Sequence, residues 1–349
     1  MHLGLPCMRD RPTPLAILPV AAMVLLLAAC GGGSGTSGRG PDVTVADLNI
    51  LHGSFCPEDT ENCRLEDRVD LYFQWLVASG CPDVATLQEG TAKIVDLVRA
   101  RAETACPFPY QVALGPRQIG LDDEIVLSRY PVTRIEQQFL VLGFRRVLLV
   151  TIDHPIGPVD VFTTHLASGS DLAQAACEGL CPPECLSAGA RTVRECQAVQ
   201  VASFVAAQHL GDGPAVIAGD FNESPGSFVY HQFVDRGWID TYLAAGNPEC
   251  DVATGIGCTS GRADEDLSQL ESPATNEIER IDFIFLVPPA PGSSCAGTID
   301  SGNDADGDGV ATRIFAGEPN PFTATCGPLP EAICWPSDHE GMQLDLNCG

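Results

Sequence analysis

Five apolar runs of the chain end in, or begin with, a side chain that can bind a metal or move a proton. Short runs of this kind, bounded by turn residues, predict strands. We expect neighbouring strands to bring these polar ends together at one rim of a sheet. Their oxygen ligands suit a hard cation such as Mg²⁺, and their histidines suit proton transfer near neutral pH. The side chains are Asn49, Glu89, His165, Asp220 with Asn222, and Asp282, and the pair Asp338-His339 lies near the C-terminus. The pattern predicts a metal-dependent hydrolase of phosphoesters.

Motifs of other reaction classes are missing from the sequence. It contains no Gly-x-Ser-x-Gly nucleophile turn, no His-Glu-x-x-His zinc helix and no phosphate-binding P-loop. The single lysine, Lys93, lies in a helical run away from any Gly-rich turn. These absences favour a metal site with oxygen ligands.

The fragments that contain these residues resemble the endonuclease/exonuclease/phosphatase superfamily. A lone Gly-Asp-Phe-Asn often marks only a turn, whereas seven fragments in the family's order cover roughly residues 42 to 345. They are Leu48–Ile50, Gln88–Glu89, Leu127–Val132, Thr164–Leu166, Gly219–Asn222, Arg280–Phe285 and Ser337–His339. The resemblance implies an α/β (α+β) fold, a two-layer β-sandwich flanked by helices as in DNase I. It also implies hydrolysis of a phosphoester, since the family includes secreted DNases, abasic-site endonucleases, neutral sphingomyelinases and inositol-polyphosphate phosphatases.

The same resemblance implies a metal site. One ion, Mg²⁺ or Mn²⁺ in its place, would lie between Asn49, Glu89 and Asp338. Whether one ion or two take part stays open. His52 has no motif of its own; it is near Asn49 and could line the pocket, but a surface loop is its expected place.

The remaining motif residues receive catalytic roles from the resemblance. Asp220 and Asn222 would orient the attacking water and hold a phosphate oxygen. His165 and His339 would lie on either side of the phosphate, stabilising charge and transferring protons. Asp282 would hydrogen-bond His339 and fix its tautomer.

Two further contacts with this site are expected. Arg145 or Arg146 would clamp the scissile phosphate, because a guanidinium suits bidentate phosphate binding; the alternative is an exposed charge at a strand edge. One of three consecutive acidic residues would support His165 from behind: Asp122, Asp123 or Glu124.

Residues 1–30 have the features of a targeting segment rather than of the fold. Arg9 and Arg11 precede a short apolar run, Leu15 to Ala29. The run ends in Leu-Ala-Ala-Cys, which resembles a bacterial lipobox with Cys30 as the lipidated residue; an ordinary secretory signal is the alternative. Residues 31–41, rich in Gly and Ser, are then a flexible tether. We expect an exported domain, residues 42–349, anchored by lipid on the periplasmic or cell-surface side.

Cysteine usage agrees with export. Of 16 cysteines, Cys7 and Cys30 belong to the targeting segment, and the even remainder predicts disulfides. Loop-like inserts at about 54–64, 171–196 and 245–262 are expected to be pinned by them. Local pairs Cys56–Cys63 and Cys250–Cys258 are plausible. Bridges are also favoured over a zinc site for the cluster Cys177, Cys181, Cys185 and Cys196.

The formal charge of −27 opposes tight binding of polyanions. The targeting segment carries a net +1, so the chain without it stands near −28. Such a field does not exclude a nuclease that holds its substrate loosely, because a bound divalent ion supplies positive charge locally.

Helical and extended patterns alternate along the chain. Apolar spacing predicts helices over Leu65–Ala78, Thr91–Ala105 and Cys196–Leu210. Antiparallel pairing is expected of Glu124–Leu127 with Val147–Ile152, and of the latter with Val159–Thr164.

An acidic turn near the C-terminus resembles the opening of a Ca²⁺ loop. Asp304, Asp306 and Asp308 alternate before Gly309, but Phe315 occupies the twelfth position, where such a loop has a bidentate Glu. A structural Ca²⁺ site and a solvated acidic turn therefore both stay open.

Three functions remain after these observations. The first is a Mg²⁺-dependent nuclease or general phosphodiesterase acting outside the cytoplasm. The second is a phospholipid headgroup phosphodiesterase similar to the sphingomyelinases, which membrane tethering favours and the lack of an evident exposed aromatic hairpin disfavours. The third is a non-catalytic, Ca²⁺-binding surface lipoprotein, which the complete motif set disfavours. The implied partners are a phosphodiester substrate and, through Cys30, a membrane; no protein partner is implied.

Overall fold

The computed structural model describes residues 42–57, 60–116, 123–169, 171–211, 213–262, 267–274, 277–288 and 311–348. The expected lipidation at Cys30, the tether, Asp122 and the acidic turn at Asp304–Asp308 lie outside these ranges. None of the helices within them is long and apolar enough to cross a membrane.

Two six-stranded sheets pack face to face, which confirms the predicted sandwich. The first has the order β11-β12-β1-β2-β4-β3 and the second the order β5-β6-β7-β8-β10-β9. Val, Leu and Ile side chains of both sheets form a shared core between them. The first sheet consists of β1 (Val43–Asn49), β2 (Val84–Gly90), β3 (Gln111–Leu114), β4 (Asp123–Ser128), β11 (Ala311–Ile314) and β12 (Gly341–Leu346). The second consists of β5 (Val132–Phe139), β6 (Arg146–His154), β7 (Gly157–His165), β8 (Ala215–Asp220), β9 (Ile239–Asp240) and β10 (Asp282–Val287).

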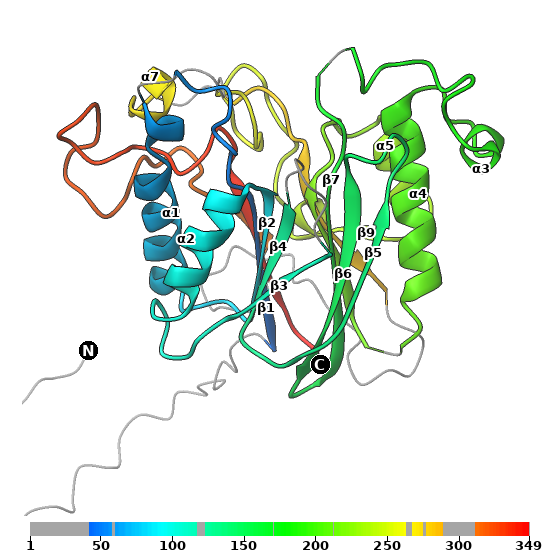
Figure 1. Cartoon of the computed structure of the whole chain (residues 1–349), viewed down its shortest axis with the longest axis horizontal. Helices are drawn as coiled ribbons and strands as arrows, with labels where there is room; N and C mark the ends of the chain where they lie inside the picture. Colours follow the sequence, from blue (N-terminus) through cyan, green and yellow to red (C-terminus); the bar gives the residue numbers. More distant parts are fainter. Residues whose placement is uncertain are drawn as a thin grey trace, which may run out of the picture. The chain divides into compact units, whose positions relative to one another are not determined.

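Helices cover the outer face of each sheet (Figure 1). On the first sheet these are α1 (Glu61–Ala78) and α2 (Ala92–Ala102), and on the second they are α4 (Val193–Gln208) and α5 (Phe228–Val234). Three shorter helices are α3 (Pro183–Ser187), α6 (Thr241–Ala244) and α7 (Leu267–Leu270). All three predicted helices are present. The last begins earlier than predicted because Thr192 and Glu195 form a capping box at its start.

One predicted strand pairing is wrong. β4, which contains Glu124–Leu127, pairs with β2 and β3 and not with β6. The segment after Ser128 carries the chain into the other sheet, so β4 and β6 belong to opposite layers. An apolar run shows that a strand is buried but not which strand lies beside it. The predicted pairing of β6 with β7 is confirmed.

The register of the second sheet brings three of its polar ends together. β7 and β8 are parallel with His165 opposite Asp220, and the antiparallel β10 places Asp282 opposite Asp220 from the other side. Gly219 precedes Asp220 with φ +146°, and a Cβ there would lie 2.0 Å from the carbonyl oxygen of Thr164. Only glycine fits so close an approach, which sets the direction in which Asp220 leaves the strand.

The first sheet delivers its polar ends to the same rim. β1 and β2 are parallel, so Asn49 lies opposite Gln88 and beside Glu89. Glu89 has φ +64°, a left-handed conformation that non-glycine residues adopt only where the surroundings hold them. The bend turns its carboxylate out of the strand and toward Asn49.

Disulfides pin several of the loops. The expected pairs Cys56–Cys63 and Cys250–Cys258 are confirmed. The four clustered cysteines form Cys177–Cys181 and Cys185–Cys196, so their sulfurs are bridged to one another, as expected, rather than forming a zinc site. Two further bridges are Cys81–Cys106 and Cys326–Cys334.

Removal of Cys81–Cys106 by alanine substitution is expected to lower the free energy of unfolding by about 3.5 kcal/mol, the loop-closure value for its sequence separation of 25. Removal of Cys177–Cys181, which spans 4 residues, is expected to cost only about 2 kcal/mol. Urea unfolding of the two double mutants measures both values. Equal losses of unfolding free energy would show that native contacts, and not loop-closure entropy, dominate the contribution of these disulfides to stability.

Candidate active site

Asp220 lies at the centre of the site. Its Oδ2 accepts a hydrogen bond from Asn49 Nδ2 at 3.1 Å and lies 3.3 Å from His165 Nε2 and 3.8 Å from His339 Nε2. Its Oδ1 accepts from the backbone N–H of Asn222 at 2.8 Å. One buried carboxylate thus contacts side chains from both sheets and from the C-terminal segment.

His339 is held as a cation. Asp282 Oδ2 lies 2.9 Å from its Nδ1, so Nε2 points toward Asp220 and toward Asp338, whose Oδ2 is 3.9 Å away. Burial alone would lower the pKa of His339, but the carboxylates of Asp282, Asp338 and Asp220 outweigh it and raise that pKa well above the usual range. Nε2–H is therefore a charged donor aimed into the site.

His165 has the opposite character. Arg145 Nη1 lies 2.8 Å from its Nδ1. A guanidinium only donates, so Nδ1 accepts and the ring proton sits on Nε2, facing Asp220. Burial and the charge of Arg145 hold the pKa of His165 well below its usual range. His165 is a neutral donor, whereas His339 is a charged one.

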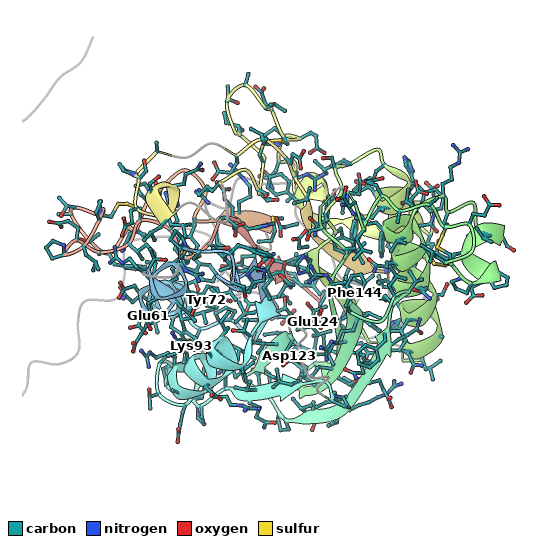
Figure 2. All side chains as sticks on the ribbon, turned by 45° about the horizontal axis from the view of Figure 1, so that its top comes forward. Glu61, Tyr72, Lys93, Asp123, Glu124 and Phe144 are labelled. Carbon is teal, nitrogen blue, oxygen red and sulfur yellow. A yellow bond between two sulfur atoms is a disulfide. The ribbon has the colours of Figure 1, made fainter. Side chains whose placement is uncertain are left out.

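Of the three acidic residues expected to support His165, Asp122 lies outside the described ranges and the other two are engaged with Arg146, while Glu89 Oε1 lies 3.9 Å from His165 Nδ1. Asp123 and Glu124 lie near the middle of the molecule, between the α1–α2 side and the side that carries α4 (Figure 2). They pair with Arg146 at 3.3 and 3.1 Å. Burial raises the pKa of Glu124 to about 8 although Arg146 opposes it. Arg146 is 1 % exposed and is engaged in the core, so Arg145 is the arginine of the predicted two that lies at the site.

Glu89 and Asp338 form the acidic side of the site. Glu89 Oε1 accepts from Asn49 Nδ2 at 3.0 Å, and Oε2 accepts from the backbone N–H of His52 at 2.6 Å. Burial alone would raise the pKa of Glu89, but His52 and these hydrogen bonds lower it, so Glu89 is ionised. Burial raises the pKa of Asp338, and the charge of Glu89 adds to the effect. A cation between the two carboxylates would relieve this repulsion.

The donor set fits a hard divalent ion. Glu89 and Asp338 supply carboxylate oxygens, which are the ligands that Mg²⁺ and Mn²⁺ prefer. Asn49 donates its Nδ2–H to Glu89 and Asp220, and its Oδ1 accepts from the backbone N–H of Leu51, so it would bind an ion only with its amide turned the other way. Burial raises the pKa of Asp220 to about 7, although the charge of His339 opposes the shift. Asp220, Asp282 and His339 also present ligand atoms within 4.8 Å of one another. Asp282 and a protonated His339 are engaged with each other, so we favour the oxygen set.

His52 was expected on a surface loop but lies against the metal side of the site. Its side chain is 15 % exposed, and its Nδ1 is 3.7 Å from Glu89 Oε2. The ring of Phe55 packs edge-on against it, 5.2 Å between centroids, and Phe55 itself is 69 % exposed. The only signal in the sequence was the position of His52 three residues after Asn49.

The chain matches the family model described as Endonuclease/Exonuclease/phosphatase family over residues 48–339. It belongs to that family. No curated protein sequence matched the chain.

Solved structures share the fold of the family. D. rerio TDP2 humanised by 14 mutations is similar, with a TM-score of 0.57 and 17% identity over 87% of this chain and 98% of its own. A Bacteroides vulgatus endonuclease/exonuclease/phosphatase has a TM-score of 0.56 and 16% identity over 88% of this chain and 99% of its own. A Bacteroides thetaiotaomicron mannosyl-6-phosphatase has a TM-score of 0.56 and 16% identity over 87% and 99%. Members of this endonuclease/exonuclease/phosphatase family are phosphoester hydrolases and generally depend on a divalent metal.

Asp282→Asn is expected to lower the pKa of His339, because it removes the largest of the charges that favour the cation. Wild-type His339 keeps its proton as the pH rises through neutrality, and the variant loses it at lower pH. Histidine ¹⁵N shifts of the metal-free protein, followed from pH 5 to pH 9, measure the change. An unaltered titration would show that Asp338 and Asp220 alone maintain the charge.

Proposed function

We propose that the protein is an exported, Mg²⁺-dependent phosphodiesterase that hydrolyses nucleic acid. The observation that carries the proposal is the convergence on Asp220 of a charged His339, a neutral His165 and the Asn49–Glu89 pair. This arrangement can place a phosphodiester between two proton-bearing imidazoles and an ion-binding acidic side.

Each residue has a role that follows from its environment. Asp220, with its pKa near neutrality, is suited to accept a proton from the attacking water, and the N–H of Asn222 holds its other oxygen. The cationic His339 would stabilise a phosphate oxygen and protonate the leaving oxygen, while His165 would donate a neutral hydrogen bond. Arg145, beside His165, would add positive charge at the scissile phosphate. A bound Mg²⁺ would polarise a phosphate oxygen and neutralise developing charge.

The disulfides support export. Bridges of this number persist in oxidising compartments and are rare in the cytosol. An exported location together with the lipobox-like Leu-Ala-Ala-Cys30 supports attachment to the cell envelope.

A second candidate is hydrolysis of phospholipid headgroups. Phe55 favours it, because an exposed aromatic ring beside His52 could contact apolar parts of a lipid. The lack of an evident exposed aromatic hairpin in the sequence opposes it. The two candidates differ in substrate and not in the chemistry of the site.

Glu89→Gln is expected to reduce Mg²⁺-dependent turnover by at least about 10²-fold, because it removes an ionised ligand while preserving shape. We would assay plasmid DNA, RNA, sphingomyelin and bis-p-nitrophenyl phosphate with oxidised protein covering residues 42–349, each with Mg²⁺ and with EDTA. Circular dichroism of the variant confirms its fold.

Cleavage of DNA or RNA that EDTA and Glu89→Gln both abolish would support the nuclease. Cleavage of sphingomyelin alone would select the second candidate. Wild-type rates in Glu89→Gln would sink the assignment of Glu89 to the metal.

Cys30→Ser is expected to release the protein from the membrane fraction, because no thiol remains to carry a lipid. Fractionation of cells that express the full chain, with Cys7→Ser as the matched control, measures this. Retention of both variants in the membrane fraction would contradict the lipid anchor.

A further inference from the structure

Arg68 of α1 is buried without a carboxylate partner among the residues that the structure describes. Of the buried arginines in the described ranges, the others each pair with an acidic side chain, such as Arg64 with Glu271 and Arg280 with Asp240. Arg68 is 0 % exposed and instead uses all five of its N–H donors on backbone carbonyl oxygens. The acceptors, 2.5 to 3.1 Å away, are Ile50, Leu51, Asn62, Cys63 and Pro336.

These carbonyls belong to both sides of the metal site. Ile50 and Leu51 directly follow Asn49, and their oxygens bind Nη1 and Nη2. Pro336 lies two residues before Asp338, and its oxygen shares Nη1 with that of Ile50. A single guanidinium therefore joins the segment that carries Asn49 to the segment that carries Asp338.

Two acceptors, Asn62 and Cys63, lie in the first turn of α1, where the backbone is not helical. Their φ values of 53° and 56°, and that of Leu51 at 58°, fall in the left-handed region. Non-glycine residues stay there only when surrounding contacts over-determine them. Arg68 supplies those contacts in a planar fork that a lysine ammonium, with three donors on one atom, cannot reproduce.

The charge of Arg68 and its geometry have opposite effects on a bound cation. Burial lowers the pKa of Arg68 to about 10, while Asp338 and Glu89 favour its charged form, so it remains a cation at neutral pH. A buried positive charge alone would repel a divalent ion. The hydrogen bonds favour the ion, because they hold the ligand segments in place before it binds.

We propose that Arg68 is a positioning residue that holds Asn49 and Asp338 at the separation required for metal binding. The proposal rests on the metal-dependent function proposed above. In this proposal the geometry of the guanidinium, rather than its charge, has the larger effect on metal binding.

Mn²⁺ binding, measured by electron paramagnetic resonance without substrate, tests this directly. Arg68→Lys keeps the charge and loses the fork, and it is expected to weaken Mn²⁺ binding by about tenfold or more. The Arg68→Met variant is expected to bind Mn²⁺ at least as weakly as the Arg68→Lys variant does. Arg64→Lys is the matched control: Arg64 lies on the same helix and donates to Gly327 and Glu331 carbonyls, away from Asn49. The Arg64→Lys variant is expected to have a lower melting temperature than the wild type and a Mn²⁺ affinity within about twofold of the wild-type value.

Unchanged affinity in a folded Arg68→Lys variant, or tighter binding in Arg68→Met, would overturn the proposal. If both variants fail to fold, Ser337→Ala still tests it, because Ser337 Oγ donates to Asn49 O at 2.5 Å and is the other link between the two segments. Unchanged Mn²⁺ affinity in that variant would also contradict the proposal that a fixed separation of Asn49 and Asp338 is required for metal binding. Wild-type protein that binds Mn²⁺ but hydrolyses no phosphodiester would refute the proposed function and leave this inference standing.

Discussion

Buried negative charge at one rim of the sandwich is the constraint on which the structure of the site depends. Glu89, Asp220, Asp282 and Asp338 converge there, and carboxylates in such a setting are stable only beside compensating cations. His339 compensates part of the charge from within the cluster. A divalent ion on the acidic side would compensate more of it.

The two histidines show how neighbours divide one side-chain type into two chemical roles. A carboxylate, Asp282, stands behind His339 and makes it a cation, whereas a guanidinium, Arg145, stands behind His165 and keeps it neutral. Arg145 also fixes the proton of neutral His165 on Nε2, and Asp282 orients His339 so that its Nε2–H faces Asp220. The two imidazoles, one at each end of a bound phosphate, would therefore differ in strength as proton donors. They differ because their surroundings differ, although both residues are histidines.

Rigid backbone supports this arrangement. Glu89 and Asn222 adopt left-handed conformations at the strand ends, and Gly219 allows β8 to pass close to Thr164. Such strain persists because two packed sheets and disulfide-pinned loops leave the chain no relaxed alternative. Arg68 gives the same support to the loop after β1.

The sequence alone determined the strand-end residues, the helices and the local disulfides, because periodicity, turn residues and short cysteine spacings are properties of neighbouring positions. The sandwich class followed from the resemblance that the ordered motifs carry. It could not determine that β4 lies in the opposite sheet from β6, since burial does not identify a strand's neighbour. It also could not show that Arg146 pairs in the core while Arg145 contacts His165, or that Arg68 binds carbonyls on both sides of the metal site. Those contacts join residues up to 268 positions apart, and only tertiary packing decides which of two adjacent side chains faces a distant partner.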